Sequence, residues 1–287
     1  MKPALTVVGH AAYDYIFSVE RQPGKDESAY IREWGRYYGG GGANIAVGFS
    51  SLGGKGILYT AAGRDFARYE RHLKKKGVEL ILKRSNKKTP SAFVFNDSET
   101  QKSYFFWGAS EEMENMEGIG SEYLHIAPCH PSLAMKMAKR AKFFAFEPGQ
   151  DMRKYDSRHL THMAEMADII FCNEKEIAYI RRRVSLKGKN VIVTLGARGS
   201  RIYGRNVKIN AVKPSRFVDA TGAGDAYKAA FWFAFLNGNE MEKCCRFAST
   251  FASFVVERMG AQNFPSLQKV MERYVRNFDD TLVFRQQ

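Results

Sequence analysis

Short apolar runs, rich in β-branched and aromatic residues and bounded by residues typical of turns, recur along most of this chain. They cover residues 5–8, 56–60, 123–126, 143–146, 169–172 and 191–194. Runs of this length without polar alternation are typical of strands that are buried on both faces of a parallel sheet. Between them lie amphipathic stretches long enough for crossover helices, at 44–52, 66–76, 133–140 and 160–166. Because parallel strands need such connections, the alternation predicts a layered α/β fold.

Two strand-like segments interrupt this alternation. Residues 91–95 and 103–107 are joined by 96–100, whose Asn, Asp and Ser residues are typical of a hairpin turn. An antiparallel hairpin inside a parallel α/β chain suggests a lid, with Phe105 and Trp107 on one face of its second strand. The alternative is that the aromatics of the hairpin pack on the main sheet. Helical patterns follow at 223–236, 240–258 and 266–277, and no linker marks a second domain.

The cysteines and the N-terminal residues favour a cytoplasmic protein. Cys129, Cys172, Cys244 and Cys245 show no C-x-x-C spacing, which favours buried free thiols in a reducing compartment. The first apolar run turns polar at His10 and is too short for a signal peptide. No apolar stretch is long enough to span a membrane. The six histidines are scattered, and none is assigned a role.

The formal net charge of +14 invites a nucleic-acid interpretation. The basic clusters 74–76 and 181–183, however, each close a segment with helical spacing, where cations complement the helix dipole. No helix-turn-helix, zinc-knuckle or RNP pattern accompanies them. We therefore expect solvated helix ends and no nucleic-acid partner; a non-catalytic basic protein that binds nucleic acid remains the remote alternative.

The segment from Phe217 to Tyr227 carries the strongest chemical signal. Gly222, Ala223 and Gly224 are small enough for the backbone to approach an anion, and they lead into an apolar helix whose first N–H groups have no internal partner. Asp225 begins this helix and has an ordinary interpretation as a cap. That interpretation does not predict Asp219 or the two glycines. A carboxylate beside an anion hole is suited to taking a proton from a hydroxyl during phosphoryl transfer.

Asp219-x-Thr221-Gly-Ala-Gly-Asp225 resembles the C-terminal signature of the ribokinase family, also called the PfkB family. The glycine cluster 39–42, followed by Ala43 and Asn44, resembles its N-terminal signature. The resemblance implies a ribokinase-like three-layer α/β/α sandwich with a small β lid, built as a single domain over residues 1–287. The lid would come from segments near 10–38 and 85–110. It also implies an ATP-dependent kinase with Asp225 as the base and Gly222, Ala223 and Gly224 as the anion hole.

The same resemblance implies roles for further residues in binding the acceptor, ATP and metal ions. The acceptor would contact Asp14, Gly40, Gly41 and Asn44. ATP would contact Asn173, Thr194, Gly196, Gly199 and Ser249. Glu176 would orient Mg²⁺ through water, and a monovalent cation such as K⁺ would lie near Asp219, Thr221 and Gly260. Ribokinases proper usually carry lysine at the place of Gly41. The motifs of P-loop enzymes, dinucleotide-binding enzymes and zinc enzymes are absent from the sequence.

The acceptor is predicted to be a nucleoside, phosphorylated on its 5′-hydroxyl. Residues 9–20 and 103–108 look similar to archaeal broad-specificity nucleoside kinases of the family. A nucleobase needs apolar or aromatic surface, which Tyr13, Phe105 and Trp107 would supply. A ribokinase-type or fructokinase-type sugar kinase is the alternative, and Glu147-Pro-Gly149 with Arg153 keeps a sugar phosphate open as acceptor. We expect a homodimer that pairs through the lid, and no membrane partner.

Overall fold

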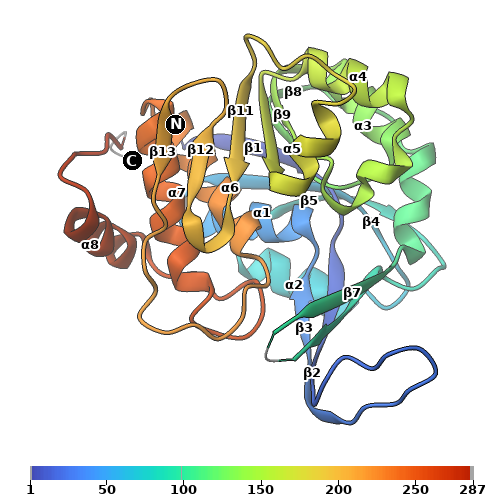
Figure 1. Cartoon of the computed structure of the whole chain (residues 1–287). Coiled ribbons are helices and arrows are strands. Elements are labelled where there is room, and N and C mark those ends of the chain that lie inside the picture. The colour runs from blue at the N-terminus through green and yellow to red at the C-terminus, as the bar shows by residue number, and fades with distance from the viewer. Residues whose placement is uncertain (1, 98, 285–287) are drawn as a thin grey trace.

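The main sheet of the protein has nine strands, in a computed structural model that describes residues 2–97 and 99–284 (Figure 1). Its order is β13 (Val207–Ile209), β12 (Ser200–Ile202), β11 (Asn190–Thr194), β10 (Ile169–Asn173), β9 (Ala141–Phe146), β8 (Ser121–Ile126), β1 (Ala4–Val8), β4 (Lys55–Ala62) and β5 (Glu79–Arg84). The strands from β11 to β5 are parallel, and β12 and β13 continue the sheet as antiparallel strands. All six runs predicted from the sequence are strands of this sheet.

Helices cover both faces of the main sheet because successive strand residues point to opposite sides. Along β10, Ile169 and Phe171 pack into one hydrophobic cluster, whereas Ile170 and Cys172 pack into the other. The first cluster lies under α1 (Gly41–Ser51), α2 (Ala67–Lys75), α6 (Ala223–Leu236), α7 (Met241–Val255) and α8 (Leu267–Asn277). The second lies under the 3₁₀ helix η1 (Gly108–Asn115), α3 (Pro131–Ala138), α4 (Ser157–Met166) and α5 (Glu174–Ile180). The predicted three-layer α/β/α sandwich is confirmed.

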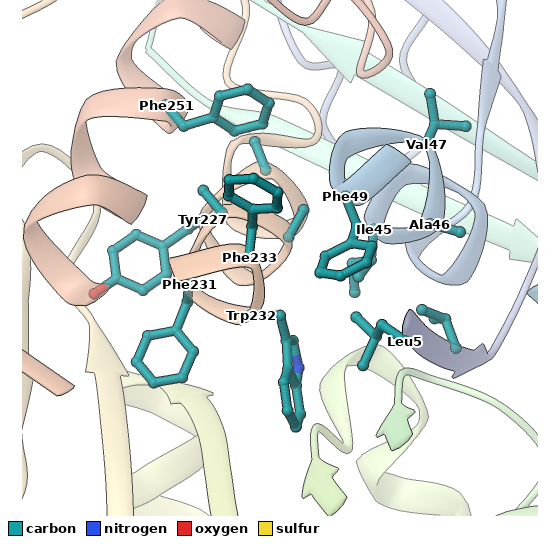
Figure 2. Packing of buried hydrophobic residues seen from close by; sticks show 14 of the residues in the cluster. Leu5, Ile45, Ala46, Val47, Phe49, Tyr227, Phe231, Trp232, Phe233 and Phe251 are labelled. Atoms are coloured by element: carbon teal, nitrogen blue, oxygen red, sulfur yellow. The ribbon is translucent and has the colours of Figure 1, made fainter. Parts of the chain in front are cut away.

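Helices α1 and α6 pack closely, and their contact positions the functional part of the molecule. Every residue from 226 to 234 of α6 is buried. Figure 2 shows Phe49 of α1 beside Phe233 of α6, whose rings are 6.1 Å apart and nearly perpendicular. A Cβ on Gly48 would lie 2.8 Å from the Cβ of Ala229, so small residues allow this approach. The two helices consequently begin near one another, at Gly41 and Ala223.

A separate four-stranded sheet forms the lid, in the order β3 (Ile31–Gly39), β2 (Ala12–Val19), β6 (Ser91–Asn96) and β7 (Gln101–Phe106). Its inner face carries Asp14, Ala92, Val94, Ser103 and Phe105. Its outer face is an aromatic ladder with stacked pairs such as Phe17 and Phe95, whose ring centres are 4.7 Å apart. This outer face of the lid consists of Tyr15, Phe17, Trp34, Phe93, Phe95 and Tyr104. The hairpin prediction is confirmed, and the alternative that its aromatics pack on the main sheet is wrong for Phe93 and Phe95.

The basic clusters and the cysteines lie where the sequence predicts. Helix α2 ends at Lys75, and Arg181 directly follows α5, so both clusters are at helix C-termini. The four cysteines are free and buried. Among the described residues, no helix combines the length and apolarity needed to cross a bilayer.

Candidate active site

Two cavities lie on either side of the N-terminus of α6. The first has a volume of about 460 Å³ and lies between the lid and the ends of the parallel strands. The second has a volume of about 420 Å³ and lies between the segment 194–217 and α7. Ala220 lines both cavities, Gly222 and Asp225 line the first, and Ala223 and Gly224 line the second. The turn 220–225 therefore lies between two adjoining ligand-sized spaces.

The conformation of this turn depends on Gly222 and Asp219. Gly222 has φ +77°, and a Cβ on it would lie 2.3 Å from the Cβ of Ala261, so glycine is required. Buried Asp219 accepts hydrogen bonds from the Thr221 N–H and hydroxyl through Oδ1, and from the Gly260 N–H through Oδ2 at 2.9 Å. The structure thus brings together the three residues predicted near a monovalent cation, and their mutual bonds fix the turn.

The backbone N–H groups after the turn are oriented by the start of α6. The Ala223 N–H donates to Ala220 O at 3.1 Å. This N–H, predicted to be part of the anion hole, is therefore already bonded within the turn. Gly224 and Asp225 follow in the first helical turn, where N–H groups have no partner within the helix. These are the groups that can bind an anion between the cavities.

Asp225 presents its carboxylate to the first cavity. The Asn44 amide donates to its Oδ2 at 2.8 Å, and Lys228 Nζ lies 3.6 Å from its Oδ1. Burial raises the pKa of Asp225; the Lys228 ammonium and the Asn44 hydrogen bond oppose this, while Glu147 adds to it. Asn44 is itself held by Gln262, whose Nε2 donates to Asn44 Oδ1 at 3.0 Å. Asn44 therefore orients the carboxylate in addition to lining the cavity.

Asp14 is buried on the inner face of the lid, and its place depends on the glycine cluster. A Cβ on Gly39 would lie 1.9 Å from Asp14 Oδ2, so any other residue would occupy the place of the carboxylate. Gly40 has φ +89° and also lacks room for a Cβ. Burial, together with the charges of Asp225 and Asp219, raises the pKa of Asp14 to about 7.

Gly41 differs from its two neighbours in the glycine cluster. A Cβ on it would make ordinary contacts, 3.6 Å from Asp225 Oδ1 and 3.7 Å from Pro128 Cδ. Gly41 is the first residue of α1, and its backbone φ is not positive. The position therefore opens into the first cavity beside Asp225.

Aromatic side chains of the lid line the far side of the first cavity. Phe105 is 52% exposed, and Trp107 follows β7 directly. Trp107 is held from the body of the protein: Lys154 Nζ lies 3.7 Å from the centre of its ring, and the His10 ring meets it edge-on at 5.4 Å. The prediction that Tyr13 lines this site is wrong. Tyr13 lies on the opposite side of β2 from Asp14, is buried, and donates its hydroxyl to Asp65 O.

The second cavity contains four of the five residues predicted to contact ATP: Thr194, Gly196, Gly199 and Ser249. Ser249 Oγ accepts from the Val212 N–H at 3.0 Å and donates to Asn210 O, so it holds the segment that borders the cavity. Asn173 borders the first cavity instead. Asn173 and Glu176 form a capping box at the start of α5, with the Asn173 N–H donating to Glu176 Oε2 at 2.9 Å. Burial and Glu147 raise the pKa of Glu176.

Two further residues at the site, His10 and Lys228, were not assigned a role from the sequence, and Glu147 was considered only as part of the segment that keeps a sugar phosphate open as acceptor. His10 lines the first cavity, where Ser110 Oγ and Asp151 Oδ2 each lie 2.7 Å from one of its ring nitrogens. Glu147 lines the same cavity and forms a buried ion pair with Lys228. A signal for Lys228 was present in the sequence, since it is the one charged residue among the apolar residues 226–234.

A helix N-terminus between two ligand-sized cavities is suited to the transfer of a phosphoryl group from one ligand to the other. The model of the pfkB family of carbohydrate kinases matches residues 2–269, and the chain belongs to this family. It is 36% identical to a nucleoside kinase of Methanocaldococcus jannaschii, over 94% of this chain and 96% of that protein. A crystal structure of the M. jannaschii nucleoside kinase matches with a TM-score of 0.85 and 34% identity, over 95% of this chain and 98% of that one. The fold is also shared with a Burkholderia thailandensis nucleoside kinase in complex with inosine, with a TM-score of 0.87 at 22% identity, over 97% and 99% of the two chains.

Proposed function

We propose that this protein is an ATP-dependent nucleoside kinase, which transfers the γ-phosphoryl group to the 5′-hydroxyl of a ribonucleoside. The observation that carries the proposal is the position of Asp225 and the turn 220–225 between two cavities, one suited to each substrate. Nucleoside kinases are also among the relatives that are most similar over nearly the whole chain.

In the proposed reaction, Asp225 takes the proton from the acceptor hydroxyl. Asn44 holds Oδ2 of its carboxylate, and Oδ1 faces the open position at Gly41. The hydroxyl oxygen attacks the γ-phosphorus, and the bond to ADP breaks. The N–H groups at the start of α6 stabilise the charge that develops on the phosphoryl oxygens. This arrangement places the base and the anion site on adjacent residues of one helix terminus.

The lining of the first cavity supports a nucleoside over a free sugar. Near Asp225 it is polar, and Asp14 and Asn44, which line this part, would bind the ribose hydroxyls. Toward the lid it has an apolar part, formed by Val94, Phe105 and Trp107, beside the polar residues Ser91, Gln101 and Ser103. A free pentose would leave this apolar end without a partner, whereas a nucleobase would cover it.

We further propose that ATP brings Mg²⁺, which neutralises phosphate charge when bound. Mg²⁺ keeps several waters and is usually held by phosphates and one or two carboxylates. Glu176 fits this chemistry, because burial and Glu147 disfavour its negative charge and a dication would relieve this. A monovalent cation near Asp219, Thr221 and Gly260 is part of the same proposal.

The free, buried cysteines support a cytoplasmic location, and the outer face of the lid supports a homodimer.

A side-by-side kinetic panel with ATP tests the acceptor class. Inosine, guanosine, adenosine and cytidine would be compared with ribose and fructose, and each ribonucleoside with its 2′-deoxy form. We expect the highest kcat/KM for a ribonucleoside. Removing the 2′-hydroxyl should leave Asp14 without a hydrogen-bond donor, and such a loss costs about 1–3 kcal/mol, or roughly 5-fold to 160-fold in kcat/KM.

Two outcomes separate the parts of the proposal. A kcat/KM for ribose or fructose above that of every nucleoside would overturn the nucleoside assignment and favour the sugar-kinase alternative. Asp225→Asn should lower kcat by about 10²–10⁴, the usual contribution of a positioned proton acceptor, without preventing ATP binding. Near-normal turnover in that variant would remove Asp225 from the role of base.

A further inference from the structure

A lysine and a glutamate lie buried beside the proposed base. Lys228 follows Asp225 by three residues on α6, so both side chains project from the same side of the helix. Its Nζ contacts Glu147 Oε1 and lies 3.6 Å from Asp225 Oδ1. An isolated buried ammonium is costly, which explains why this one is paired. Glu147 and Asp225, the two carboxylates beside Lys228, both line the first cavity, so this ionic group borders the substrate site.

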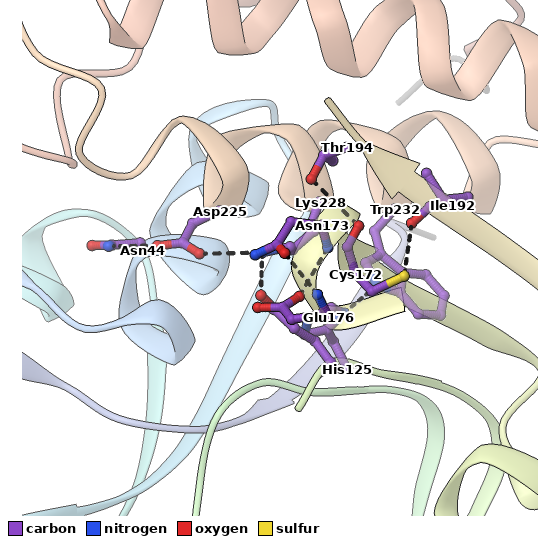
Figure 3. Close-up of polar contacts among 11 residues, drawn as sticks. Asn44, His125, Cys172, Asn173, Glu176, Ile192, Thr194, Asp225, Lys228 and Trp232 are labelled. Carbon is purple, nitrogen blue, oxygen red and sulfur yellow. Dashed lines mark hydrogen bonds and ion pairs between the residues drawn. The ribbon is translucent and has the colours of Figure 1, made fainter. Parts of the chain in front are cut away.

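Glu147 is held in its ionised form by residues on its other side. Trp232 Nε1 donates to His125 Nδ1 at 3.0 Å, so the other nitrogen of this buried imidazole carries its proton. That Nε2–H donates to Glu147 Oε2 at 3.3 Å. Burial alone would raise the pKa of Glu147, but Lys228 and His125 outweigh it and lower the pKa. Contacts therefore run from Trp232 through His125, Glu147 and Lys228 to Asp225. Figure 3 shows Trp232, His125, Lys228 and Asp225 in this group of polar contacts.

The charges around Asp225 are mostly negative. Asp14 faces it from β2, and Glu147 faces it from the segment after β9. Asp219 adds charge beside Asp14, and Glu176 of α5 adds charge beside Glu147. Lys228 is the cation among these six groups. A carboxyl group in such surroundings tends to keep its proton, and a protonated Asp225 could not accept one from a hydroxyl.

We infer that Lys228, held by Glu147, is a positioning residue for phosphoryl transfer, whose ammonium keeps the Asp225 carboxylate ionised in this cavity. The inference rests on the proposed role of Asp225 as the base. Lys228 is well placed for it: Nζ lies 3.5 Å from where a Cβ on Gly224 would be, so it is adjacent to the anion-binding turn. Asn44 holds one oxygen of Asp225, and Lys228 attracts the other.

The direct test is a titration of Asp225 that does not depend on activity. The protein would be labelled with ¹³C at the aspartate carboxyl carbons, and the Asp225 signal assigned by its loss in Asp225→Asn. We expect Lys228→Met to move the titration midpoint upward by about one pH unit or more, because an opposite charge at this distance has shifted carboxyl pKa values by 1–3 units. Glu147→Gln should move it downward, because it removes a negative neighbour and leaves Lys228 to Asp225. Lys243→Met is the control, because this lysine of α7 donates to Thr281 O and does not contact the site, and it should leave the Asp225 midpoint unchanged.

Kinetics give the second measurement. In the pH profile of kcat/KM for the preferred nucleoside, the fall in rate on the acid side should move to higher pH in Lys228→Met and to lower pH in Glu147→Gln. Lys228→Arg keeps the cation, so its profile should stay near that of the wild type. If Lys228→Met does not fold, Lys228→Met/Glu147→Gln replaces it, since this variant leaves no unpaired member of the pair. In the double variant the midpoint should still rise, by less than in the single variant.

The results separate this inference from the proposed function. An Asp225 titration midpoint that does not move in Lys228→Met or in Lys228→Met/Glu147→Gln, or shifts of the same sign in Lys228→Met and Glu147→Gln, would overturn the inference even if turnover fell. A fall in turnover that is equal at every pH would also overturn it and assign Lys228 a structural role. Retained turnover in Asp225→Asn would instead overturn the proposed base.

Discussion

Among single residues, Asp14 is expected to release a proton when the acceptor binds. Its pKa is raised to about 7 by burial, Asp225 and Asp219. Ribose hydroxyls donate to a carboxylate, so acceptor binding should favour its ionised form and release a proton. Calorimetry in buffers of different ionisation enthalpy should show release approaching one proton at about pH 6 and little at about pH 8.5. Asp14→Asn should abolish this release, and release that persists unchanged in the variant would assign the proton to another group.

The same residue makes a prediction for stability. Because the folded pKa of Asp14 is raised above its ordinary value of 3.8, its ionisation opposes folding. The destabilisation is absent below about pH 4, develops as the pH rises, and is complete above about pH 7. Asp14→Asn should therefore melt at a higher temperature than the wild type at high pH, with the difference vanishing at low pH. A constant difference across this range would contradict the assigned pKa.

Which residues could be predicted depended on whether their surroundings are local in sequence. Asp225 and Gly222 stand in one short motif, and the structure places both at the junction of the cavities. Lys228 stands out in the sequence as one charge in an apolar helix, but its partner could not be named, because Glu147 is 81 residues away. Tyr13 was misplaced since a shift of one residue along a strand reverses the face.

Among the elements, the lid is expected to close over the acceptor. Its inner face lines the first cavity, and closure would exclude water that could otherwise accept the phosphoryl group. Hydrogen exchange should slow in peptides covering 12–19 and 91–106 when nucleoside is added. The surface segment 183–189 is the internal control and should not change. Equal exchange of the lid peptides with and without nucleoside would contradict closure.

Element prediction succeeded where burial produces a continuous apolar run, and it failed for short or half-exposed strands. The strands β1, β8 and β10 are buried on both faces, and their composition shows it. In β3, Arg32, Glu33 and Arg36 alternate with aromatics because the lid is open to solvent, so the segment was assigned to the lid without its strands being resolved. The strands β12 and β13 have three residues each, too few for any periodicity to be visible.

At the scale of the whole molecule, the outer face of the lid is expected to pair with a second copy. Trp34 and Tyr104 are each 61% exposed there, beside the stacked Phe17 and Phe95. An aromatic surface of this kind on a sheet is typical of an interface. Light scattering should give twice the chain mass of 32.5 kDa for the wild type. Trp34→Glu with Tyr104→Glu should halve it.

Val275→Glu is the matched control for the dimer, because Val275 is also an exposed apolar residue, 63% exposed on α8 far along the chain from the lid. It should leave the mass unchanged. A wild-type protein that is monomeric at micromolar concentration would contradict the dimer, and loss of mass in both variants would indicate a general effect of added charge.

The open position at Gly41 has a consequence for how this scaffold could diversify. Gly39, Gly40 and Gly222 are fixed by the space around them, so a change at any of them would damage the site itself. Gly41 is a glycine without that requirement, since a side chain there would enter the substrate cavity beside Asp225 with ordinary contacts. A single codon change at this position could install a new group next to the reacting hydroxyl while the backbone stays as it is. Directed evolution of acceptor range would have its shortest path through this residue.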